Sequence, residues 1–131
     1  MLEINRKIEE LNLEPDLIIT HAPIDVNRDH QITFESALIV GRSITKQIDI
    51  LSCEVLSSSE WADMPFHANY YVNIEHTLDL KLKAMEAYKY ELRSFPHPRS
   101  LEGIRYKAYQ RGMEVGWKAA EAYHVVRWFR R

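Results

Sequence analysis

The stretch from Leu17 to His30 reads L-I-I-T-H-A-P-I-D-V-N-R-D-H, and it decides the fold class that the sequence predicts. It begins as an apolar run, continues as a polar loop and ends where amphipathic spacing starts. This order of strand, loop and helix is typical of α/β proteins, in which polar loops at the carboxyl ends of strands carry binding and catalytic side chains. The stretch therefore predicts an α/β fold and the place of a functional site.

Length and composition limit the class of protein. The chain has 131 residues, 17 of them basic and 19 acidic, with a formal net charge of -2. This length fits one domain over residues 1–131, and the charge pattern gives no sign of a nucleic-acid partner. The only cysteine, Cys53, can form neither an internal disulfide nor a thiolate metal cage. No apolar run approaches the roughly 18 residues that span a bilayer, and we expect a soluble, cytoplasmic protein.

Hydrophobic periodicity predicts helices and strands that alternate along the chain. Helices are expected over the first dozen residues, 32–41, 77–93 and 100 to about 117–120, and strands over 16–20, 48–56, 69–74 and 122–129. Ser100 is expected to cap the last helix, and Asp29 the helix after the polar loop. The first strand is expected to be buried, and the last strand to lie at a sheet edge because Arg127 accompanies it.

A stripe of small residues marks the last predicted helix. Its members recur every four residues: Ala108, Gly112, Gly116 and Ala120. A glycine inside a helix costs about 1 kcal/mol relative to alanine. The stripe therefore predicts that another backbone approaches closely at this face.

The polar loop contains residue types that zinc binds when thiolates are absent, namely His21, Asp25, Asp29 and His30. A hydrolytic zinc site takes three protein ligands and keeps a position open for water. Each of these residues also has an ordinary structural interpretation, as a strand-end donor, a turn residue, a helix cap or a residue of the first helical turn. From the residues alone both interpretations stay open.

Several motifs along the chain resemble the second half of a PIG-L (LmbE-like) deacetylase. In chain order they are P-D-L-I-I-T-H (15–21), D-V-N-R-D-H (25–30), S-S-S-E-W (57–61), Y-K-Y-E-L (88–92), F-P-H-P-R-S (95–100), R-G-M-E-V-G (111–116) and A-E-A-Y (120–123). The resemblance implies a partial Rossmann-like α/β sandwich that lacks its first strands. It also implies a zinc-dependent hydrolase that removes acetyl groups from N-acetylglucosamine-type sugars or related amides.

The resemblance assigns roles to three residues of the polar loop. It makes His30 a metal ligand and Asp29 its polar neighbour in the catalytic site. Some family members carry a histidine at position 27 that acts as a general acid or steadies an oxyanion. Here the residue is Asn27, which can donate a hydrogen bond but cannot shuttle a proton at neutral pH.

The resemblance also implies a set of substrate-binding residues. His21 and Asp25 match the family's loop and would line the pocket, while Arg99, beside His97 in a proline-flanked loop, would hold a hydroxyl or carboxylate of the substrate. The alternative for the second pair is structural, with an arginine that ties its loop to a helix end.

The family's A-H-P-D-D-E type motif has no counterpart in this sequence. That motif supplies a histidine and an aspartate to zinc and a second aspartate as the general base. The chain alone thus owns one ligand and no base, and zinc is expected only if another segment or chain supplies the rest. Three explanations stay open: a fragment of a longer deacetylase, one half of a split enzyme, or a catalytically silent domain.

A noncatalytic sugar-binding or assembly module is therefore the alternative function. A sheet without its first strands would expose a strand edge and apolar faces, which favours pairing with another chain. The expected partners are a small acetamido sugar or conjugate, and a complementing N-terminal half or further copies of this chain.

Overall fold

The computed structural model describes residues 2–42 and 46–130. The contacts between residues divide the chain into two compact units, Met1–His67 with His124–Arg131 (unit 1) and Ala68–Tyr123 (unit 2). Met1 and Arg131, the ends of the predicted domain, lie outside the described residues. The expectation of one domain over the whole chain stays a prediction, and each unit is described by itself.

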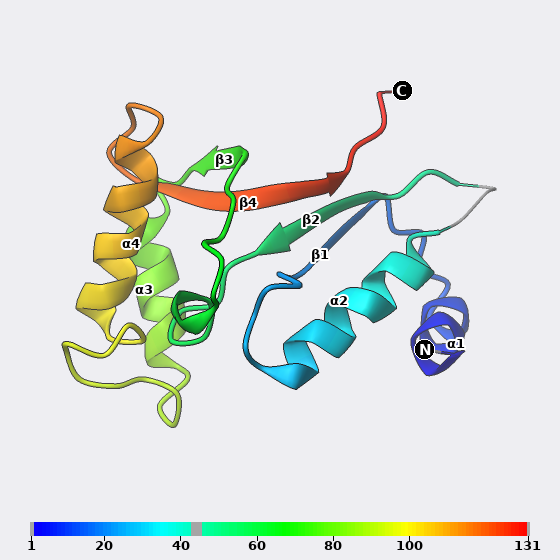
Figure 1. Cartoon of the computed structure of the whole chain (residues 1–131), viewed down its shortest axis with the longest axis horizontal. Coiled ribbons are helices and arrows are strands. Elements are labelled where there is room, and N and C mark those ends of the chain that lie inside the picture. Colours follow the sequence, from blue (N-terminus) through cyan, green and yellow to red (C-terminus); the bar gives the residue numbers. More distant parts are fainter. Residues whose placement is uncertain (1, 43–45, 131) are drawn as a thin grey trace. The chain divides into compact units, whose positions relative to one another are not determined.

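The elements follow one another in α/β order (Figure 1). Unit 1 contains α1 (Leu2–Glu10), β1 (Leu17–His21), α2 (Arg28–Val40), β2 (Asp49–Cys53) and the short 3-10 helix η1 (Ser59–Trp61). Unit 2 contains β3 (Tyr70–Asn73), α3 (Leu78–Glu86) and α4 (Leu101–Met113), and β4 (Ala120–Arg127) starts in unit 2 and ends in unit 1. The strands form a four-stranded mixed sheet in the order β1-β2-β4-β3, which confirms the α/β class.

In unit 1, β1 and β2 form a parallel pair in which Leu17 lies opposite Asp49 and His21 opposite Cys53. Helix α2 contacts both strands and runs beside β1 in Figure 1. Gly41 follows α2 at a close approach, since a Cβ there would lie 2.5 Å from Cδ1 of Ile50. The core of this unit consists of small and aliphatic side chains: Ala22, Ala37, Ile48, Ile50 and Leu51.

The expectation that the first strand is buried was wrong. Only Thr20 of β1 is buried, whereas Leu17 is 40% and Ile19 54% exposed. Strand β1 lies at the end of the sheet order, so among the described residues it has a strand neighbour on one side only. An apolar run indicates that the side chains of a strand can be buried by other elements. Here the described elements leave the side chains of Leu17 and Ile19 exposed to solvent.

In unit 2, β3 and the first half of β4 are antiparallel, with Tyr70 opposite Tyr123. Helices α3 and α4 contact each other, and the buried apolar side chains include Ile74, Leu78, Leu82, Ile104 and Ala108. Ser100 caps α4 as expected, because its Oγ accepts a hydrogen bond of 2.9 Å from the N–H of Gly103.

Two predicted helices end earlier than their periodicity indicates. Helix α3 ends at Glu86, and turns follow where a helix to residue 93 was expected. Helix α4 ends at Met113, so Gly116 lies in the following turn with a φ of 77° and Ala120 begins β4. A positive φ strongly favours glycine, which explains why the small-residue spacing continues past the helix.

The close backbone approach expected at the small-residue stripe is confirmed at Gly112. A Cβ on this residue would lie 2.5 Å from the backbone oxygen of Trp117 and 2.8 Å from the N of Ala119. The approaching backbone is the chain's own return from α4 to β4. Glycine is thus required where the segment 117–119 passes over the helix end.

The position of the last strand also differs from the expectation. Strand β4 lies between β2 and β3 and is therefore an inner strand. Its arginine is the last residue of the strand and is exposed, so the charge does not mark a sheet edge. No helix in the described residues is long and apolar enough to cross a membrane.

Candidate functional site

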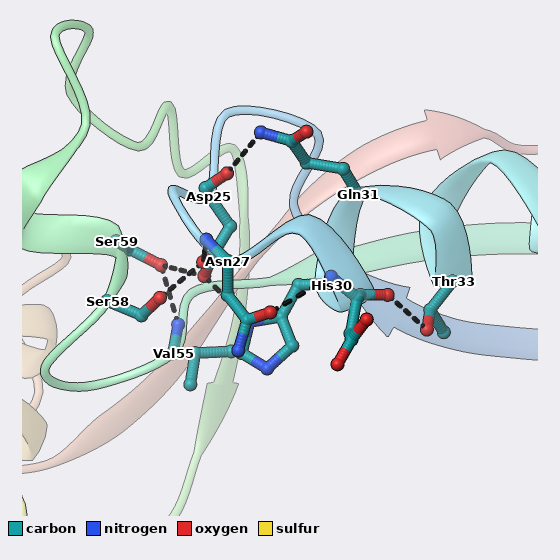
Figure 2. A network of polar contacts seen from close by, with 9 residues as sticks. Asp25, Asn27, His30, Gln31, Thr33, Val55, Ser58 and Ser59 are labelled. Atoms are coloured by element: carbon teal, nitrogen blue, oxygen red, sulfur yellow. Dashed lines mark hydrogen bonds and ion pairs between the residues drawn. The ribbon is translucent and has the colours of Figure 1, made fainter.

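The carboxylate of Asp25 is the centre of a polar network in unit 1 (Figure 2). Asp25 is completely buried. Its Oδ1 accepts a hydrogen bond of 2.8 Å from the N–H of Asn27 and another from the hydroxyl of Ser58. Its Oδ2 accepts one of 3.2 Å from the hydroxyl of Ser59. Both oxygens are therefore engaged by groups of the protein itself.

The network extends from Asp25 into the backbone on either side. The side-chain amide of Gln31 donates a 2.7 Å hydrogen bond to the backbone carbonyl of Asp25. The hydroxyl of Ser59 also accepts a 2.7 Å bond from the N–H of Val55, which follows β2. The loop after β1, the first turn of α2 and the loop after β2 are thereby joined around Asp25 (Figure 2).

Hydrogen bonding keeps Asp25 ionised although it is buried. Burial by itself raises the pKa of this carboxyl. The hydrogen bonds from Ser58 and from the Asn27 N–H, together with His30, lower the pKa by more than burial raises it, so the net pKa lies below its ordinary value. At neutral pH, Asp25 is a carboxylate. A negative charge thus lies inside the loop that carries the two histidines.

His30 and His21 lie together next to this charge. Nδ1 of His30 is 3.1 Å from Oδ2 of Asp25, at ion-pair distance but without the geometry of a regular hydrogen bond. The imidazole rings of His21 and His30 stack, with centroids 4.1 Å apart and an interplanar angle of 12°. Burial and then the charge of His30 lower the pKa of His21, and Asp25 only partly opposes this shift. His21 is therefore neutral at pH 7.

Asn27 caps helix α2, which corrects the expectation for Asp29. Oδ1 of Asn27 accepts a 2.9 Å hydrogen bond from the N–H of Asp29. Asp29 is the second residue of the helix and so lies past the cap position, and its backbone carbonyl accepts a 2.7 Å bond from Thr33 Oγ1. Both Asn27 and Asp29 are exposed. Their catalytic roles stay predictions.

His97 and Arg99 belong to unit 2, in the loop between α3 and α4. Nδ1 of His97 accepts a 3.0 Å hydrogen bond from the N–H of Arg99, and the Arg99 guanidinium pairs with Glu91 earlier in the same loop. These contacts are structural, but they hold the loop together and do not tie it to a helix end, as the structural alternative expected. Binding of substrate by this pair stays a prediction.

Ser58 and Ser59 are neighbours of Asp25 to which the sequence motifs assign no role. Their hydroxyls are the side-chain donors to Asp25, and they follow Asp25 by more than thirty positions in the sequence. Both serines belong to the S-S-S-E-W motif (57–61). Their distance from Asp25 along the chain does not indicate that they contact it.

The described residues do not fit a self-contained zinc site. Among them, no group of three or more His, Cys, Asp or Glu side chains is placed to hold a metal ion. His21, Asp25 and His30 lie together, but both oxygens of Asp25 already accept hydrogen bonds. The donor set is therefore smaller than the three protein ligands that a hydrolytic zinc site takes.

Comparison with known proteins supports the fold. No protein-family model matches the sequence, and no curated protein matches it. The crystal structure of the conserved protein TT1542 from Thermus thermophilus is similar over 99% of this chain, with a TM-score of 0.72 and 16% sequence identity. The likeness concerns the fold alone. The match covers 62% of that chain, so this chain spans less than two thirds of the length of that protein.

Proposed function

We propose that this chain contributes part of the active site of a zinc-dependent N-deacetylase that acts on acetamido sugars. His30 is the metal ligand in this proposal, and the other ligands and the general base come from outside the chain. The sequence motifs suggest this function. The observation that carries it is the contact of 3.1 Å between Nδ1 of His30 and the buried carboxylate of Asp25.

A carboxylate at one ring nitrogen is a common feature of metal-binding histidines. Such histidines usually donate the N–H of the nitrogen that does not bind the metal to a carboxylate, a carbonyl or water, which fixes the tautomer and the ring orientation. An ionised Asp25 at Nδ1 favours the proton on that nitrogen and leaves Nε2 of His30 as the nitrogen available to a metal ion. In this proposal Asp25 is a positioning residue and does not contact substrate.

Asn27 can serve the proposed reaction only as a hydrogen-bond donor. Its Oδ1 is engaged in capping α2, so the amide Nδ2 is the group left for a substrate oxygen. An amide does not exchange a proton with substrate at neutral pH. The general acid, like the general base, must therefore be supplied by another group.

Complementation tests the proposal. The full chain is mixed with a polypeptide that carries an apolar strand followed by H-P-D-D, and zinc content and acetate release from N-acetylglucosamine are measured. We expect the mixture to bind zinc and release acetate, and His30→Ala to abolish both. His76→Ala, at an exposed histidine of unit 2, is the matched control and should change neither. A folded mixture that binds no zinc and releases no acetate would contradict the proposal.

A noncatalytic sugar-binding module is the second candidate. The observation that favours it is the lack of a three-ligand group among the described residues. This candidate predicts that N-acetylglucosamine binds the chain alone, and that binding persists in the presence of a chelator and in His30→Ala. Loss of sugar binding upon either treatment would favour the metal-dependent function.

A further inference from the structure

The hydroxyls of Ser58 and Ser59 are buried parts of the candidate site that the proposed reaction does not yet use. Ser58 is 9% and Ser59 7% exposed. Both follow β2 at the start of η1, and their backbone N–H groups donate to the carbonyl of Val55 at 3.1 and 2.9 Å. One turn of the chain therefore brings the two hydroxyls to the same carboxylate, that of Asp25 (Figure 2).

The acceptor sites of the Asp25 carboxylate are almost all occupied. A carboxylate has two oxygens with about four lone-pair sites in total. Oδ1 accepts hydrogen bonds from the N–H of Asn27 and the hydroxyl of Ser58, and Oδ2 accepts one from the hydroxyl of Ser59. Among the described residues, one acceptor site is thus left, on Oδ2. This is the oxygen that lies 3.1 Å from Nδ1 of His30.

The two serines differ in what else their hydroxyls do. Oγ of Ser59 accepts a 2.7 Å hydrogen bond from the N–H of Val55. Since a hydroxyl has a single proton to donate, this bond directs the proton of Ser59 to Asp25. The hydroxyl of Ser58 does not cap η1. A substitution at Ser58 therefore changes the contact with Asp25 without removing the acceptor of a backbone N–H.

We propose that Ser58 and Ser59 are positioning residues for His30 that act through Asp25. Their hydroxyls hold the carboxylate so that its remaining acceptor site faces Nδ1 of His30. A neutral imidazole carries its proton on one nitrogen only. A proton on Nδ1 meets the carboxylate favourably, whereas a lone pair there would face a negatively charged oxygen. His30 is thereby held with its proton on Nδ1 and with Nε2 free.

The use of Nε2 by a metal ion rests on the proposed function, but the position of the ring proton does not. It is therefore measured on the full chain without metal, by nitrogen-15 NMR of His30 at pH 8. We expect the proton on Nδ1 in the unchanged chain. A proton on Nε2 of His30 in the unchanged chain would overturn the inference, whatever the variants do.

Variants at Ser58 test the role of the hydroxyl. Ser58→Ala should lower the ratio of the Nδ1-protonated to the Nε2-protonated form about fivefold or more, because the carboxylate loses a charge-assisted hydrogen bond. Ser58→Thr keeps the hydroxyl and should restore the ratio. Ser36→Ala is the matched control, since Ser36 is also 9% exposed and donates to the carbonyl of Ile32 in α2. An unchanged ratio in a folded Ser58→Ala chain would refute the role of Ser58.

Ser58→Cys takes the place of Ser58→Ala if the alanine variant is unfolded by circular dichroism. A thiol is a weaker donor than a hydroxyl, so the ratio should change in the same direction by a smaller factor. A folded Ser58→Cys chain with the ratio of the unchanged chain would equally refute the role of Ser58.

The complementation mixture separates this inference from the proposed function. There Ser58→Ala should weaken zinc binding about tenfold, as is usual when a group behind a metal ligand is lost, and Ser58→Thr should retain the affinity. If the unchanged mixture binds no zinc but Ser58→Ala moves the ring proton of His30, the proposed function is wrong and the positioning role holds. If the unchanged mixture binds zinc and Ser58→Ala alters neither the ring proton nor the zinc affinity, the positioning role alone is overturned.

Discussion

Asp25 shows how a single residue organises the candidate site. Its buried carboxylate stays ionised because two hydroxyls and a backbone N–H donate hydrogen bonds to it. Its pKa lies below the ordinary value of 3.8, so its contribution to stability is complete above that pH and is lost as the pH falls through the lower folded pKa. The same charge determines the environment of His30, and this environment supports the proposed metal-binding role.

The lowered pKa of His21 predicts a pH-dependent stability. Below the ordinary histidine pKa of 6.5 the unfolded chain binds a proton that the folded chain does not, so the free energy of unfolding falls as the pH decreases. His21→Gln should reduce this slope between pH 6.5 and the lower folded pKa. Urea unfolding at several pH values measures it. His76→Gln, at an exposed position, should retain the slope, and equal slopes in all three proteins would show that His21 titrates normally.

At the scale of elements, the start of α2 links the helix to the candidate site. Asn27 caps the helix through its Oδ1, and its own N–H donates to Asp25. Asn27, to which the resemblance assigns a place in the catalytic site, therefore also caps the helix. A loss of activity upon its substitution has to be separated from a loss of helix stability.

Substitution of the cap predicts a measurable loss of stability. Asn27→Ala removes the acceptor for the Asp29 N–H and should lower the free energy of unfolding by about 1 kcal/mol. Asn27→Asp keeps a capping oxygen and adds a favourable negative charge at the helix start, so it should restore stability. Thermal or urea unfolding of the three proteins provides the measurement. If Asn27→Ala is as stable as the unchanged chain, the cap does not stabilise α2.

At the scale of the whole molecule, the chain has the fold of a larger protein but covers only part of its length. The similar solved structure extends beyond this chain, which matches 62% of it. Within the described residues the sheet has an open edge at β1, and no three-ligand metal group is present. In the proposed function, another polypeptide supplies the remaining ligands.

This incompleteness predicts the metal content of the isolated chain. In the proposed function this chain supplies one zinc ligand, His30. The isolated chain should therefore not retain zinc in stoichiometric amount, because hydrolytic zinc sites take three protein ligands. A chelator should therefore leave the melting temperature unchanged. Elemental analysis and thermal unfolding with and without the chelator test this expectation. Stoichiometric zinc that is lost in His30→Ala would show that the chain holds a complete site by itself.

Much of the fold could be predicted from local signals, and the failures share a physical cause. The helix cap at Ser100 and the close approach at Gly112 depend on neighbours in the sequence or on a strict steric limit. The edge position of β1 and the inner position of β4 depend on which strands pair, and no local pattern specifies that pairing. For the candidate site, the sequence pointed to His21, Asp25 and His30, which the structure brings together, but not to the hydroxyls of Ser58 and Ser59 that donate to Asp25.

The sequence by itself determined the alternating elements, the α/β class and the polar loop after the first strand, because periodicity and residue chemistry act over a few neighbouring positions. Only the tertiary structure decided that Asp25 is buried under Ser58 and Ser59, that the rings of His21 and His30 stack, and that one side of β1 stays open. These features arise from contacts between segments far apart in the chain. Their energies depend on burial and on the distances between charges, which exist only once the chain has folded.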